Sequence, residues 1–205
     1  MGSGDCGCFE EAMRRMMLGT LVLMMILGLA PFAGLSTGEA AGPWKAQIVD
    51  EETGQPIEGV VVLAVWIRYT ASPGGWAGAK YYASEEVVTG PDGRFVIPRR
   101  TVINWLPLLT EIRGPEFKIF KPGYGAWGIR GWKGERPKEW EDLTVGEILT
   151  KENIVIELPP LKTREERLEF YRSPSRSPSA LVPPERTKRF DEAERMERGY
   201  LGFRD

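Results

Sequence analysis

The chain has 205 residues, 42% of them hydrophobic and 27% charged, which is enough for one domain with an ordinary core and some appendages. Lysine and arginine total 27 against 29 aspartate and glutamate, a net charge of −2, so no overall positive field favours nucleic acid as a partner. There is no histidine, which removes the commonest zinc ligand and the usual general base near neutral pH. The two cysteines, Cys6 and Cys8, lie close to the N-terminus, so the remainder has no thiol nucleophile and no disulfide. We therefore expect no enzyme and no cofactor.

Residues 1–41 are predicted to be a signal peptide or a membrane anchor. Two arginines precede residues 16–38, which carry no charge and are rich in Leu, Met and Ile. Cleavage after Ala40 or Ala41 would satisfy the small-residue rule of secretory signals. The same run is also close to the length that spans a bilayer as a retained single helix. Both alternatives place the rest of the chain outside the cytoplasm, in the periplasm, at the cell surface or secreted.

Residues 43–160 are predicted to form one β domain. Apolar and β-branched residues at 60–67 are typical of a central strand covered on both faces. Short strands broken by turns favour a sandwich over a helical or a parallel-sheet fold. Mostly alternating segments between Gly and Pro predict the other strands, at residues 45–49, 80–89, 94–97, 117–121 and 154–158.

Two turns between these strands have chemistry that can be interpreted. Residues 91–93, Pro-Asp-Gly, predict a tight turn with Gly93 at positive φ, closing a hairpin into the strand at 94–97. Pro122 and Gly123 fit the two central positions of a type II turn. These glycines are therefore expected to shape the fold and not to bind phosphate.

Three motifs follow one another along this domain: IVDEETGQPIEGVVV at 48–62, TGPDGRFVIP at 89–98 and FKIFKPGY at 117–124. In their order and spacing, residues 46–158 resemble the carboxypeptidase regulatory-like family. The resemblance implies an all-β, seven-stranded Greek-key sandwich of the transthyretin or prealbumin type, used as an accessory or binding module without peptidase activity. Residues 101–114 and 125–153 depart from the family pattern as two insertions.

The aromatic residues of the irregular segments are the candidates for a binding surface. Tryptophans on loops stack on sugars, prolines or partner side chains. The alternative is that they close the ends of a small core that has no disulfide. The candidate site residues are Trp76, Trp105, Trp127, Trp132 and Trp140.

Acidic residues near the turns raise the alternatives of a calcium site or a carboxylate-based enzyme. No Asp-x-Asp-x-Asp spacing supports calcium, and nothing in the sequence places two acids in one cleft. Solvated turn residues are the simpler interpretation, and no metal ligand is assigned. The residues concerned are Asp50, Glu51, Glu52, Glu58 and Asp92.

Residues 161–205 are predicted to be a helical tail. A capping box at Thr163 starts one helix, as a second box at Thr144 does within the preceding insertion. Residues 173–184 are rich in Ser and Pro and predict an extended flexible linker. A helix at 185–201 follows and either rests on its own domain or docks on a partner. Its expected apolar stripe is Phe190, Ala193, Met196 and Tyr200.

The sequence therefore predicts a non-catalytic, extracytoplasmic β-sandwich that acts as a structural or protein-interaction module of the cell envelope. The alternative is a carbohydrate- or peptide-binding module that uses the aromatic insertions. The expected partner is an envelope protein or a glycan, and no nucleic acid. The chain is expected to have a single membrane anchor if the N-terminal segment is retained.

Overall fold

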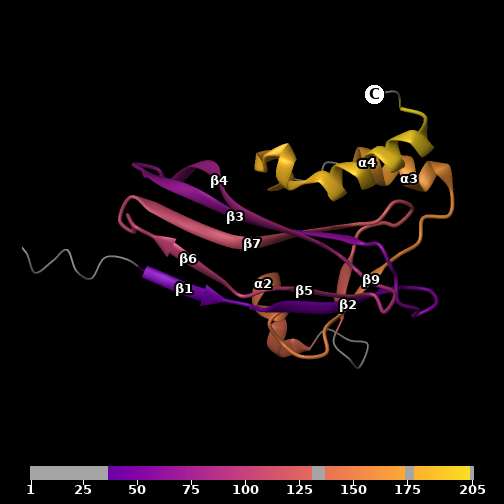
Figure 1. Ribbon diagram of the computed structural model, residues 1–205, viewed down its shortest axis with the longest axis horizontal. Helices are drawn as coiled ribbons and strands as arrows, with labels where there is room; N and C mark the ends of the chain where they lie inside the picture. The colour runs from indigo at the N-terminus through magenta and orange to yellow at the C-terminus, as the bar shows by residue number, and fades with distance from the viewer. Residues whose placement is uncertain (1–36, 131–136, 174–177, 204–205) are drawn as a thin grey trace, which may run out of the picture.

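The computed structural model describes residues 37–130, 137–173 and 178–203. They form mostly strands, with few helices, and the expected all-β sandwich is confirmed (Figure 1). A three-stranded sheet of order β4-β3-β7 faces a four-stranded sheet of order β5-β2-β9-β8, and β1 pairs with β6. The predicted signal or anchor lies outside the described residues, except that its last residues form β1. Within the described ranges, no helix is both long and apolar enough to cross a membrane.

The described residues contain the following strands and helices. The strands are β1 (Thr37–Ala41), β2 (Trp44–Asp50), β3 (Val61–Ser72), β4 (Gly75–Val88), β5 (Arg94–Ile97), β6 (Arg100–Asn104), β7 (Thr110–Phe120), β8 (Gly128–Arg130) and β9 (Val155–Leu158). The helices are η2 (Lys138–Trp140), α2 (Val145–Ile148), α3 (Arg164–Arg172), η3 (Pro178–Leu181), η4 (Pro184–Arg186) and α4 (Lys188–Leu201).

Strand β3 is the centre of the structure. It lies between β4 and β7, and every residue from Val61 to Ile67 is buried, which confirms the predicted central strand. Because side chains alternate along a strand, β3 contributes to two separate apolar clusters. One cluster lies between the sheets and includes Val62, Ala64 and Trp66. The other lies on the outer face and includes Val61, Leu63, Val65 and Ile67.

Helix α4 covers the outer face of β3 (Figure 1). Phe190 and Ala193 of α4 are buried in the outer cluster, and the ring of Phe190 lies 5.6 Å from that of Phe120 on β7. The carboxylate of Glu86 on β4 accepts the backbone N–H groups of Arg189 and Phe190 at 3.1 and 2.8 Å. A strand residue thus satisfies amides that the first turn of a helix leaves without partners. The helical tail is therefore a third layer of the domain.

The apolar stripe predicted for this helix is half wrong. Phe190 and Ala193 are buried as expected, but Met196 is 57% exposed and Tyr200 is 53% exposed. Glu197 and Leu201 are buried in their place. The buried face of α4 thus includes the charged Glu197, which a search for apolar residues does not find.

Glu197 is buried because its carboxylate has three donors. Arg167 of α3 donates to it from Nε at 2.7 Å and also from a terminal guanidinium nitrogen, and Gly123 donates its backbone N–H at 2.9 Å. The hydrogen bond with Glu197 raises the pKa of Arg167 above its ordinary value. The guanidinium also lies 3.5 Å from the centre of the Tyr200 ring. One carboxylate therefore connects both C-terminal helices to the turn after β7.

The Ser/Pro-rich segment also contributes to this layer. Val182, inside the stretch predicted as a flexible linker, is buried in the outer cluster, although residues 174–177 lie outside the described ranges. Both predicted capping boxes are confirmed, at Thr144 for α2 and at Thr163 for α3.

The turn at residues 91–93 has the expected local geometry but not the expected partner. Gly93 has a φ of 69° and donates to the carbonyl of Gly90 at 2.9 Å. However, β5 pairs with β2 and not with β4, so the hairpin prediction is wrong and the turn crosses from one sheet to the other. Turn residues specify a local reversal, whereas the partner strand depends on distant packing. The predicted turn at Gly123 is confirmed, with a φ of 83°.

The two predicted insertions contain regular structure. Residues 101–114 form most of β6 and the start of β7, so this segment extends the sheets. Residues 125–153 contain β8, η2 and α2, and their stretch 131–136 lies outside the described residues.

Replacement of Gly93 by alanine is expected to destabilise the fold more than the same change at Gly54. Both glycines have positive φ, which costs an alanine about 1 kcal/mol. A Cβ at Gly93 would also lie 2.4 Å from the carbonyl oxygen of Ile48, whereas one at Gly54 would have no atom within 4 Å. Urea unfolding should show a further loss of about 1–3 kcal/mol for Gly93→Ala. Equal losses for the two variants would contradict the close packing of this turn on β2.

Candidate binding surface

Two grooves border a bend in β7. Between the partners of Val65 and Ile67, β7 has one residue more than β3, which makes a β-bulge at Gly114 and Pro115. Gly114 has a φ of 128°, and a Cβ there would lie 2.7 Å from the carbonyl oxygen of Val65. Only glycine allows the two backbones to approach this closely. The pairing of β3 with β4 also shifts register, between Trp66 and Ile67. Beyond Ile67, the residues of β3 are mostly exposed.

The first groove lies between β7 and α2 and has a volume of about 400 Å³. The capping box at Thr144 places the short helix, so that Val145 and Gly146 face the β7 residues. Trp127, half-buried against the inner core, lies along the groove. Its lining is mixed, with Arg113, Glu116 and Thr144 beside Pro115, Phe117, Trp127 and Val145.

A buried aromatic cluster lies beside this groove. Trp44 makes edge contacts with Trp66 at 5.4 Å and with Phe117 at 6.4 Å between ring centres. Trp44 and Trp66 are almost completely buried. Such contacts add to the stability of a core beyond the buried area alone. Phe117, which lines the groove, is therefore packed against the core.

The second groove lies on the other side of the bulge and has a volume of about 380 Å³. Its lining includes Trp76 of β4, Pro107, Ile112 and Trp66. Several of these residues belong to the β3–β4 and β6–β7 hairpins, which project at one end of the molecule (Figure 1).

The five candidate tryptophans do not form one cluster. Trp127 and Trp76 line different grooves, and Trp105 is 75% exposed in the loop after β6. Trp140 is buried in the inner core, and Trp132 lies outside the described residues. Sequence reasoning did not find Arg113, Phe117 and Val145 as lining residues, since only long-range packing brings them beside Trp127.

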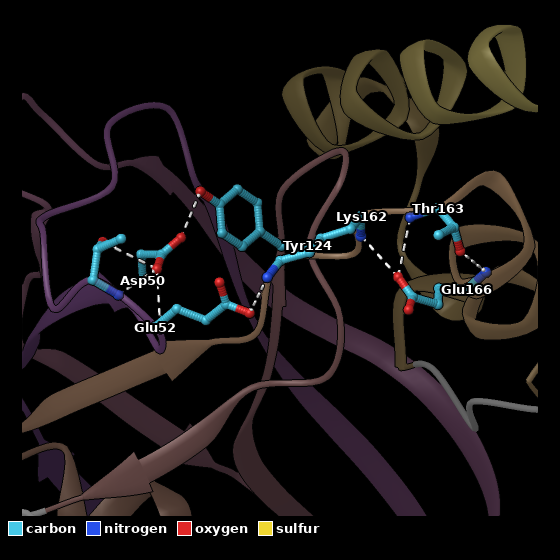
Figure 2. A network of polar contacts seen from close by, with 7 residues as sticks. Asp50, Glu52, Tyr124, Lys162, Thr163 and Glu166 are labelled. Atoms are coloured by element: carbon cyan, nitrogen blue, oxygen red, sulfur yellow. Dashed lines mark hydrogen bonds and ion pairs between the residues drawn. The ribbon is translucent and has the colours of Figure 1, made fainter.

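The acidic residues at the turn after β2 belong to a structural network, which Figure 2 shows. Asp50 Oδ1 accepts hydrogen bonds from the N–H groups of Glu52 and Thr53 at 3.0 and 2.8 Å. Its Oδ2 accepts a hydrogen bond from the hydroxyl of Tyr124 at 3.2 Å. Glu52 forms an ion pair of 2.7 Å with Lys162, just ahead of α3. These carboxylates connect the first turn of the sandwich to the start of the helical layer.

The pKa of Asp50 reflects this role. Partial burial acts to raise it, but the hydrogen bonds donated by Thr53, Glu52 and Tyr124 outweigh burial and hold the pKa below its ordinary value of 3.8. Backbone hydrogen bonds from Thr163 and Lys162 likewise lower the pKa of Glu166. In the part of the chain that the structure describes, no three acidic or cysteine side chains are grouped so as to hold a metal ion.

Comparisons of the chain with protein-family models, curated proteins and solved structures find no match. The resemblance to the carboxypeptidase regulatory-like family therefore stays a prediction.

Replacement of Asp50 by asparagine should destabilise the protein at pH 7 by about 1 kcal/mol, because solvent limits the value of these charged hydrogen bonds. Since the pKa of Asp50 is lowered on folding, its contribution is present above pH 3.8 and is lost as the pH falls through the lower, folded-state value. Urea unfolding should show that the free energies of unfolding of Asp50→Asn and the wild type differ less at pH 3 than at pH 7. Tyr124→Phe removes one donor and should have a smaller effect. A difference independent of pH would contradict this role.

Proposed function

We propose that the chain is a non-catalytic, extracytoplasmic β-sandwich that acts as a structural or protein-interaction module of the cell envelope. This proposal is based on the open groove between β7 and α2. Its lining combines a half-buried Trp127 with apolar and charged side chains, which is the composition of a site that binds a partner segment. Asp50 and Glu166, whose pKa values are lowered, accept hydrogen bonds that hold a turn and the start of α3. Their structural role agrees with a binding protein.

The N-terminal sequence supports the proposed extracytoplasmic location. Residues 16–38 have the composition of a signal peptide or an anchor. Ala40 and Ala41, the proposed cleavage positions, lie in β1 and pair with β6. Cleavage there would remove a strand, so this pairing supports a retained anchor over a cleaved signal.

The finer description of the fold belongs to the same proposal. The three-stranded and four-stranded sheets agree with a seven-stranded Greek-key sandwich of the prealbumin type, with β1 and β6 as an addition. Membership of the carboxypeptidase regulatory-like family would agree with an accessory or binding role.

Carbohydrate binding is the second candidate function. Trp127 lies in an open groove beside Arg113, Glu116 and Thr144, and an indole ring flanked by polar groups suits stacking on a sugar. Glycan-array binding that is lost in Trp127→Ala would favour this alternative over a protein partner.

Site-specific photo-crosslinking in the native envelope tests the protein-interaction proposal. A benzoylphenylalanine at Val145 would stand in the groove, and one at Met196, an exposed residue of α4 that lines neither groove, is the control. We expect a discrete adduct with one envelope protein from position 145, none from position 196, and loss of the adduct when Trp127 is replaced by alanine. Equal labelling from both positions, or none from position 145, would contradict the proposal.

A further inference from the structure

We infer that the end of the molecule formed by the β3–β4 and β6–β7 hairpins docks on the surface of a lipid bilayer. The loop after β6 places large apolar side chains in water: Trp105 is 75% exposed and Leu108 is 79% exposed, and Leu106 and Leu109 are each more than half exposed. Exposed apolar groups gathered in one loop mark an interaction surface. They contribute nothing to the two apolar clusters of the core.

Both hairpins are uncharged where they meet. Residues 70–79 and 101–110 contain no charged side chain. The two tips lie side by side, because Ala71 at the end of β3 donates its N–H to the carbonyl of Leu109 at 2.8 Å. The two hairpin tips thus form one uncharged surface, which suits a lipid interface, while Glu39 of β1 lies opposite Val102 of β6.

Two basic residues lie together at the base of this end. Arg68 and Lys80 are directly opposite each other in the β3–β4 pairing, whereas Arg100 at the start of β6 forms an ion pair of 3.6 Å with Glu85. Like charges directly opposite are unfavourable in a sheet unless an anion lies nearby. The phosphate groups of lipids would supply that anion. Glu111, the acidic residue at this level on β7, is paired with Arg113 at 2.7 Å.

The loop is closed in a way that suits an apolar environment, where unpaired polar groups are costly. The side chain of Asn104 donates to the carbonyl of Thr110 at 2.6 Å and accepts the hydroxyl of Thr110 at 2.7 Å. It also accepts the N–H of Leu106 at 3.2 Å. Leu109 donates to the carbonyl of Leu106 at 2.9 Å, and Pro107 has no N–H. These polar groups bond within the loop, while Trp105 and the leucines of the loop are exposed.

The path of the chain identifies a bilayer as the occupant. In the β1–β6 pairing, Thr37 lies opposite Asn104, the residue that closes the loop. The uncharged residues that precede Thr37 are the proposed anchor, so the chain joins the domain beside the exposed loop (Figure 1). A membrane that held residues 16–36 would therefore meet Trp105 and Leu108. This inference rests on the proposed envelope location, not on the groove at Trp127.

A fluorescent reporter in the full-length protein tests the inference. Cys6 and Cys8, the only cysteines, are replaced by serine, and an environment-sensitive NBD label is attached to a cysteine introduced by Leu108→Cys. The control carries the label at Gln55→Cys, an exposed residue of the turn after β2, at the other end of the sandwich. Both proteins are reconstituted into phosphatidylcholine vesicles with or without doxyl-labelled lipid.

Lipid contact predicts a blue-shifted emission for the label at position 108 and its quenching by doxyl lipid, with neither change at position 55. Protein that fails to float with the vesicles, or that floats with equal quenching at both positions, would overturn the inference. So would a blue shift that grows with protein concentration in the absence of vesicles, because a second copy of the chain would then cover the loop. The crosslinking experiment at Val145 is independent of all these outcomes.

Discussion

Strand β3 is buried on both of its faces, and this burial determines how the other layers are arranged. A strand that is apolar on both sides is stable only where two layers cover it, and the facing sheet covers one side. The C-terminal helices cover the other side through Phe190 and Ala193. Without them, the outer row of β3 side chains would be exposed beside Phe120. The helical layer is therefore as necessary to the domain as the second sheet.

Polar contacts fix how this layer is placed. Glu86 of β4 holds the start of α4, and the buried Glu197 joins α4 to Arg167 and to the turn at Gly123. A buried ion pair is not in itself strong evidence of stability, but the loss of one partner leaves a costly unpaired charge. The pair therefore connects α4 to α3 and to the turn at Gly123, and removal of either partner would disturb this connection.

The sequence predicts what depends on local chemistry. The apolar run of β3, the positive φ of Gly93 and the capping boxes were all readable, because a few neighbouring residues determine them. The partners of the strands could not be predicted in this way. The turn at Gly93 joins two sheets, and most of β6 lies within a segment expected to be an insertion. Glu197 was missed on the buried face of α4, since its partners lie far away in the sequence. The sequence also predicted the tryptophans as candidates one by one. Only the fold shows that Trp76 and Trp127 line different grooves and that Trp140 is buried.

Hydrogen exchange of the β3 amides shows whether the helical tail is part of the domain core. Phe190→Ala removes the largest side chain of α4 from the outer cluster, and Met196→Ala changes an exposed residue of the same helix. If the tail is an integral layer, Phe190→Ala lowers the free energy of unfolding by about 3–5 kcal/mol and speeds exchange at residues 61–67 by roughly 100-fold or more. Met196→Ala leaves this exchange close to that of the wild type. Unchanged protection of β3 in Phe190→Ala, with faster exchange confined to α4, would contradict the account.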